Sequence, residues 1–155
     1  MILGIVGQGF VGNAVYQKFK NYYEVKTFDL DSSKANSTFE EVSECDYVFV
    51  CLPTPMNSDG SCNTDIVEGV IKQLDEIGKT KGIVVKSTIP PGTTEKWNEK
   101  YNTNVIFNPE FLTERNAVSD YENQNRIILG GPRPTSTELK QVFSKVFPKA
   151  HIIKT

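Results

Sequence analysis

Short apolar runs rich in β-branched residues recur along the chain, and longer stretches with a helical spacing of apolar positions separate most of them. Such runs are typical of strands buried on both faces of a sheet. The pattern predicts strands at residues 2–6, 25–28, 47–51, 83–85, 105–107, 127–129 and 152–153, and helices at 11–19, 66–77, 94–101 and 138–146. Because strand and helix alternate, the predicted fold is α/β, with a doubly wound, mainly parallel sheet that carries helices on both faces.

Composition narrows the class of protein. The 155 residues contain no repeat, low-complexity tract or Pro/Gly/Ser-rich linker, so one domain over residues 1–155 is predicted. No apolar run approaches the about 18 residues that cross a membrane. A net charge of −2 without a block of Lys and Arg argues against nucleic-acid binding. Neither a membrane nor a nucleic acid is therefore expected as a partner.

Cysteine and histidine usage argues against a metal or disulfide protein. Cys45, Cys51 and Cys62 are odd in number and lack CxxC spacing, which fits neither a disulfide framework nor a zinc site. No basic region precedes the first apolar run, so no signal peptide is visible and a cytoplasmic location is expected. His151 is the single histidine, so a Ser/His/Asp triad or a His-rich metal site would have to be built around it alone; the alternative is a residue at a strand end. No metal is expected.

Polar and Pro/Gly-rich segments follow most of the predicted strands. The carboxyl ends of parallel strands share one edge of the sheet, where a crevice at the switch in strand order binds ligands. Thr, Ser, Lys, Asn and Glu side chains are expected at this edge, whereas a purely structural protein needs only short turns there.

The first of these segments is the glycine-rich sequence Gly7-x-Gly9-x-x-Gly12, which follows a predicted strand and opens a helix. This is the dinucleotide fingerprint of the Rossmann fold. Gly7 would make the tight turn, Gly9 would admit the pyrophosphate, and Gly12 would let the helix pack on the strand. Phe10 and Val11 would begin the helix whose N-terminal N–H groups face the phosphates.

An acidic residue supports this interpretation. Asp29 ends the second predicted strand 17 residues after Gly12, close to the spacing expected for a carboxylate that binds the ribose hydroxyls. The neighbouring Asp31, and the absence of a nearby Arg, favour NAD over NADP. The alternative is a tight strand-to-helix turn followed by a solvated acidic loop.

Two further loops have a functional and a structural interpretation. Pro53-Thr54-Pro55 can neither begin a helix nor extend a ladder, so it predicts a stiff wall from which Thr54 could hydrogen-bond a cofactor. Thr88 could hold a substrate oxygen or a water. The alternatives are a structural turn for the first loop and a helix-entry loop for the second, with Thr93 or Thr94 as the helix N-cap.

A pair of glutamates follows the strand at 105–107. Asn108 resembles an N-cap and Pro109 a first helical residue, so a helix turn would place Glu110 and Glu114 on one face as a like-charge pair. Two carboxylates beside a ligand crevice could do general-base work. The alternative is a solvated face.

Together these residues resemble the UDP-glucose/GDP-mannose dehydrogenase family. The resemblance spans nearly the whole chain in the right order, and rests on Gly7-Gln8-Gly9-Phe10-Val11-Gly12, Pro53-Thr54-Pro55, the segment 86–94 (KSTIPPGTT), the segment 108–114 (NPEFLTE), Asp120 and Arg126-Ile127-Ile128. It implies a Rossmann-type NAD-binding domain. It also implies an enzyme that oxidises the primary alcohol of a nucleotide sugar such as UDP-glucose to the carboxylate in two NAD-dependent steps, through an aldehyde and a cysteine thioester.

The resemblance also assigns roles to residues. Thr88 and Glu114 match positions that orient or activate the water in thioester hydrolysis, and Glu110 lies in the same segment. The positions that match NAD contacts are Gly7, Gly9, Gly12, Asp29, Thr54 and Thr88. The chain departs from the family at Thr113, where Arg is usual, and at Arg115, where a small residue is common.

The family's remaining parts are expected to lie outside these residues. Its central helix, with a catalytic Lys and Asn, and its C-terminal domain, with the nucleophilic Cys, would follow Thr155, and none of the three cysteines here matches that thiol. The expected function is the cofactor half of a nucleotide-sugar dehydrogenase, either as one domain of a larger enzyme or as one half of a split enzyme whose site a partner chain or a homodimer completes. The alternatives are a stand-alone NAD-binding module, or a different dehydrogenase whose site dimerisation completes.

Overall fold

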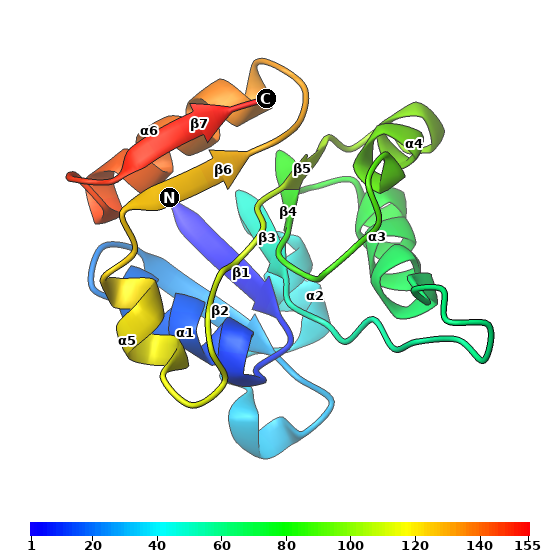
Figure 1. The fold of residues 1–155 in the computed structure, drawn as a ribbon, viewed down its shortest axis with the longest axis horizontal. Coiled ribbons are helices and arrows are strands. Elements are labelled where there is room, and N and C mark those ends of the chain that lie inside the picture. Colours follow the sequence, from blue (N-terminus) through cyan, green and yellow to red (C-terminus); the bar gives the residue numbers. More distant parts are fainter.

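Five parallel strands form the central sheet of the computed structural model, which describes all 155 residues (Figure 1). They are β1 (Ile2–Val6), β2 (Glu24–Phe28), β3 (Tyr47–Val50), β4 (Gly82–Val85) and β5 (Val105–Phe107), in the order β2-β1-β3-β4-β5. The order reverses at β1, because β2 lies on one side of it and β3 on the other. The predicted doubly wound parallel sheet is confirmed, and its switch point lies between β1 and β3.

The last two strands leave this sheet. β6 (Arg126–Leu129) and β7 (His151–Lys154) pair with each other in parallel as a separate sheet, with His151 at the strand's start. Phe107 and Gly130 exchange two backbone hydrogen bonds of 2.7 and 2.8 Å in an antiparallel bridge, which joins this small sheet to the end of β5. The end of β6 therefore runs antiparallel to the end of β5.

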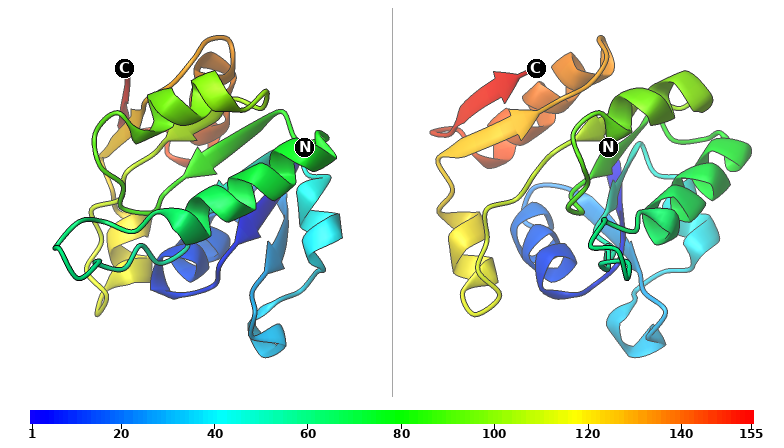
Figure 2. Two further views of the ribbon diagram at one scale, coloured as in Figure 1. Left: turned by 90° about the vertical axis from the view of Figure 1, so that its right-hand side faces the viewer. Right: turned by 45° about the vertical axis from the view of Figure 1, so that its right-hand side comes forward.

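Helices cover both faces of the central sheet, as predicted (Figure 2). The four predicted helices are present as α1 (Phe10–Phe19), α3 (Asp65–Ile77), α4 (Thr93–Lys100) and α6 (Thr135–Val146). The additional elements are α2 (Phe39–Ser43), α5 (Ala117–Glu122) and the 3₁₀ turn η1 (Ser32–Lys34). They are too short for a helical period to show in the sequence. The predicted N-cap of α4 was wrong, because Gly92 occupies it with φ of 84° and the Thr93 hydroxyl donates to the Pro90 carbonyl.

The strands of the central sheet contribute side chains to two separate cores, one on each face. Along β3, Tyr47 and Phe49 pack with α1, α5 and α6, whereas Val48 and Val50 pack with α2, α3 and α4. Because both faces of the strand are buried, the sequence shows an apolar run rather than an alternation. The two layers fix the sheet, so the loops at its carboxyl edge start from rigid positions.

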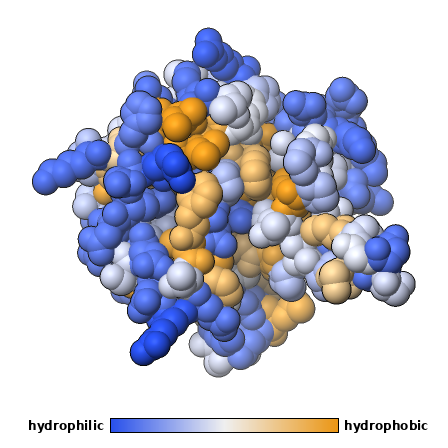
Figure 3. Space-filling model, viewed as in Figure 1, coloured by the Kyte–Doolittle hydropathy of each residue, from blue (hydrophilic) through white to orange (hydrophobic).

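The surface matches the composition. On the face shown in Figure 3, polar residues cover the periphery and apolar residues gather toward the middle. No helix is both long enough and apolar enough to cross a membrane.

Candidate functional site

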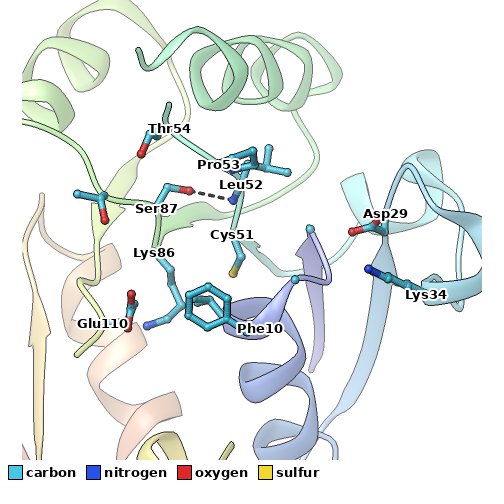
Figure 4. Close-up of a pocket in the computed structure, with 14 residues that line it drawn as sticks. Phe10, Asp29, Lys34, Cys51, Leu52, Pro53, Thr54, Lys86, Ser87 and Glu110 are labelled. Atoms are coloured by element: carbon cyan, nitrogen blue, oxygen red, sulfur yellow. Dashed lines mark hydrogen bonds between the residues drawn. The ribbon is translucent and has the colours of Figure 1, made fainter. Parts of the chain in front are cut away.

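A cleft of about 430 Å³ opens at the carboxyl edge of the sheet, at the switch point (Figure 4). Eight of the residues predicted to bind cofactor or to act in catalysis line it: Gly7, Gly9, Phe10, Val11, Asp29, Thr54, Thr88 and Glu110. Six residues that were not predicted as site residues complete the lining: Lys34, Cys51, Leu52, Pro53, Lys86 and Ser87. The remaining two predicted residues lie elsewhere, Gly12 beneath the turn and Glu114 in a neighbouring hollow.

The three glycines between β1 and α1 have different steric surroundings. Gly7 has φ of 98°, and a Cβ on it would lie 2.3 Å from the Cys51 carbonyl oxygen, where β1 and β3 diverge. A Cβ on Gly12 would lie 1.8 Å from the Gly7 carbonyl oxygen. A Cβ on Gly9 would meet nothing within 4 Å, because it points into open space. Two glycines therefore make the turn, and the third leaves room for a ligand.

The N-terminus of α1 presents free donors to the cleft. No side chain caps the helix at Gly9, and the amides of Phe10 and Val11 have no acceptor within the protein. Unpaired N–H groups and the positive end of the helix dipole favour an anion such as a pyrophosphate. These residues fit a dinucleotide.

Asp29 lies at one end of the cleft, after β2. Its carboxylate accepts hydrogen bonds from the amide of Gln8 (2.7 Å) and the amide of Asp31 (2.8 Å). These bonds fix the carboxylate against the glycine turn. Lys34 lines the same end of the cleft (Figure 4). Asp31 does not line it, because its carboxylate accepts from the amide and hydroxyl of Ser33, bonds that hold its pKa below the usual value.

The loops after β3 and β4 are held together by Ser87. Its hydroxyl accepts from the Leu52 amide (2.9 Å) and is 3.4 Å from the Val50 carbonyl, so it anchors the start of the Pro53-Thr54-Pro55 wall. Thr88 is exposed at the rim, with its backbone oxygen 3.6 Å from the Cys62 thiol. Of the two adjacent hydroxyls, Ser87 is structural and Thr88 faces the ligand space.

The predicted helix turn after Asn108 was wrong. Residues 108–113 form no helix, because the Asn108 side chain is bonded within the core rather than to a helix amide, and the Glu110 carboxylate accepts from the Leu112 amide. Glu110 and Glu114 therefore do not share a helix face. Glu110 is half-buried in the cleft, and Glu114 is exposed in the neighbouring hollow beside Phe10.

The sequence placed Lys86 at this edge of the sheet but assigned it no role in the site. It is only 3% exposed, and its ammonium donates to Oδ1 of Asn108 (2.8 Å) and approaches the Asn108 carbonyl (3.3 Å). The ammonium lies 5.3 Å from the centre of the Tyr121 ring and makes no salt bridge with a carboxylate. Burial lowers the pKa of Lys86 to about 8, against the opposing effects of Cys51 and Glu110. The signal in the sequence for a buried lysine was the position of Lys86, which directly follows a buried apolar strand.

The cysteines are free thiols, as predicted. Burial raises the pKa of Cys45 to about 11 and that of Cys51 to about 12, so both are protonated and inert near neutral pH. No group of three or more His, Cys, Asp or Glu side chains is placed to hold a metal ion. The groups that the cleft offers a ligand are backbone amides and a few polar side chains.

Comparison with known proteins identifies relatives that match most of the chain. Residues 24–150 match the model of the UDP-glucose/GDP-mannose dehydrogenase family, NAD binding domain. UDP-glucose 6-dehydrogenase of Streptococcus pneumoniae is 32% identical, over 84% of this chain and 41% of its own length. UDP-glucose 6-dehydrogenase of Campylobacter jejuni is 28% identical, over 98% of this chain and 47% of its own length.

A solved structure shares the fold. The UDP-D-ManNAc dehydrogenase of Pyrococcus horikoshii superposes with a TM-score of 0.84 at 20% identity, over 100% of this chain and 47% of that one. The chain thus spans less than half the length of each of these relatives.

Proposed function

Since the chain belongs to the UDP-glucose/GDP-mannose dehydrogenase family, as its NAD-binding domain, we propose that it is the cofactor half of a nucleotide-sugar 6-dehydrogenase. The observation that carries this proposal is the cleft itself. A glycine turn with open space at Gly9, uncapped amides at α1 and the Asp29 carboxylate lie along one groove at the switch point. The substrate class, a nucleotide sugar such as UDP-glucose, follows from the relatives.

The cleft residues divide by position. The turn around Gly9 and the amides of Phe10 and Val11 would hold the pyrophosphate, and Asp29 would accept hydrogen bonds from the adenosine ribose. Thr54 and Thr88 lie along the remaining wall. Bound NAD supplies the oxidising capacity for the alcohol and aldehyde steps.

We place water activation at the end of the cleft that lies opposite Asp29 (Figure 4). Glu110 lines that end half-buried, with Thr88 on the rim, so its carboxylate and this hydroxyl can orient a water between them. Glu114 lies in the adjoining hollow and reaches the same water only if residues 110–114 shift or a second chain closes over them. We propose that the complete site forms in the cytoplasm and that the thiol comes from a polypeptide segment outside residues 1–155.

The Asp29→Asn variant tests the ribose contact. Asparagine keeps an acceptor for the Gln8 amide but removes the charge, so the fold should persist while the dissociation constant for NAD rises roughly tenfold. The measurement is a fluorescence titration with NADH and competition by NAD. Asp31→Asn is the matched control, because its carboxylate is bonded to Ser33 and should leave the affinity within about twofold. Equal effects of both variants would contradict this placement of the ribose.

The catalytic proposal is tested on the protein purified at its native length, with any chain that copurifies. UDP-glucose should reduce two NAD molecules per sugar oxidised, measured by NADH absorbance. NAD binding without reduction by UDP-glucose or GDP-mannose would instead identify a stand-alone NAD-binding module. Turnover of a small hydroxy acid would identify a different dehydrogenase.

A further inference from the structure

The cleft contains one buried charge that dinucleotide binding does not use. Asp29 and Lys34 mark one end of the cleft, and Lys86 and Glu110 mark the other, with the α1 N-terminus between them (Figure 4). A dinucleotide with its adenosine at Asp29 and its pyrophosphate at Gly9 must extend its nicotinamide toward Lys86. The two redox forms of the cofactor differ by one positive charge on that ring and are alike elsewhere.

From this placement we infer that Lys86 is a specificity-determining residue, whose ammonium disfavours the positively charged oxidised cofactor relative to the reduced one. The inference rests on the proposed NAD site. A lysine that is 3% exposed and lacks a salt bridge keeps an incompletely balanced charge at the end of the cleft toward which the nicotinamide would extend. Asn108 contributes only neutral acceptors to it.

Three titratable groups face Lys86 from the surrounding elements. Cys51 follows β3, Glu110 follows β5, and Tyr121 lies on α5. The pKa of the Cys51 thiol is about 12 and burial holds that of Tyr121 well above its usual value, so both stay neutral while Lys86 titrates near 8. Raising the pH through 8 therefore removes the positive charge of Lys86 without ionising Cys51 or Tyr121.

The expected result is a change in relative affinity. The ratio of the dissociation constants for NAD and NADH should fall roughly tenfold between about pH 7 and about pH 9, because two unit charges about 6 Å apart at an effective dielectric constant of about 40 interact by about that factor. The measurement is NADH fluorescence with NAD competition on the 155-residue chain at each pH, with circular dichroism as the check on folding.

Matched variants distinguish a local effect of the Lys86 charge from an effect of the overall charge of the cleft. In the Lys86→Met variant, the ratio of the dissociation constants for NAD and NADH should be low at every pH, as in the wild-type chain at about pH 9. Glu110→Gln should raise this ratio. Lys34→Met removes a lysine at the adenosine end, where the two forms are identical, so it should change both dissociation constants by the same factor. Cys62→Ser should keep the pH dependence, which excludes the thiol beside Thr88.

These measurements distinguish a failure of the inference about Lys86 from a failure of the proposed NAD-binding function. If both cofactor forms bind and their ratio is independent of pH in the wild-type chain, the inference is wrong and the NAD site stands. If Lys34→Met shifts the ratio as much as Lys86→Met, the effect is not local and the inference is again overturned. If neither form binds, the proposed function and the inference fail together.

Discussion

Replacing Gly12 with Ala should unfold the turn that forms the cleft and abolish NAD binding. In α1 the new methyl group would lie 1.8 Å from the Gly7 carbonyl oxygen and 2.9 Å from its carbon. Both are backbone atoms that cannot rotate away, so helix and strand must separate. We expect a loss of about 3 kcal/mol in the free energy of unfolding, measured by urea denaturation.

Substitutions at two other glycines are controls for the effect of Gly12→Ala. Gly69 lies in α3, and a methyl group added to it would meet nothing within 4 Å, so Gly69→Ala should stabilise the protein by about 0.5–1 kcal/mol through helix propensity. Gly9→Ala should leave stability nearly unchanged, because its methyl group points into open space, yet it should abolish NAD binding by filling that space. Normal NAD affinity in the Gly9→Ala variant would contradict the assignment of the pyrophosphate.

The Asn108→Ala variant should be the other severely affected protein. Asn108 is 2% exposed, its Oδ1 accepts from the Lys86 ammonium at 2.8 Å, and its Nδ2 donates to the Ile128 carbonyl at 2.8 Å. Alanine would leave a buried cation and a half-buried carbonyl without these partners. We expect a loss of about 3 kcal/mol in the free energy of unfolding, measured by urea denaturation near neutral pH.

The pH dependence of this loss of stability distinguishes the effect of the unpaired Lys86 charge from the effect of the space that the missing Asn108 side chain leaves. The pKa of Lys86 in the folded protein is about 8, below the usual value of 10.5, so the unfolded chain binds more protons between these values. Raising the pH through this window should therefore recover part of the stability lost by Asn108→Ala, because neutral Lys86 tolerates the loss of its acceptor. Asn123→Ala, whose amide bonds are exposed, should change stability by less than about 0.5 kcal/mol. An Asn108→Ala variant as stable as Asn123→Ala would show that Lys86 is solvated.

The sequence predicted the features that depend on local patterns. Strands such as β1 are found because burial on both faces produces a continuous apolar run, and α3 is found because its apolar positions keep a helical period over three turns. The edge that carries the cleft follows from the parallel order of the strands. The glycine turn is visible because backbone approach distances restrict Gly7 and Gly12 to glycine.

The features that were missed depend on contacts between distant residues. Whether Lys86 points into the protein or into solvent is decided by Asn108, 22 residues away, and by the Tyr121 ring. The same contact overturned the predicted helix turn, because an asparagine that bonds Lys86 and Ile128 cannot also cap a helix. The two-stranded β6–β7 sheet likewise depends on the bridge between Phe107 and Gly130, which leaves no periodic signal.

The most direct test of the central claim is isothermal titration calorimetry of the 155-residue chain with NAD and with NADP. We expect NAD to bind with one site per chain, and NADP to bind at least about tenfold more weakly because its 2′-phosphate would displace the ribose from the fixed Asp29 carboxylate. Equal affinity for the two cofactors, or no heat of binding with NAD, would contradict it.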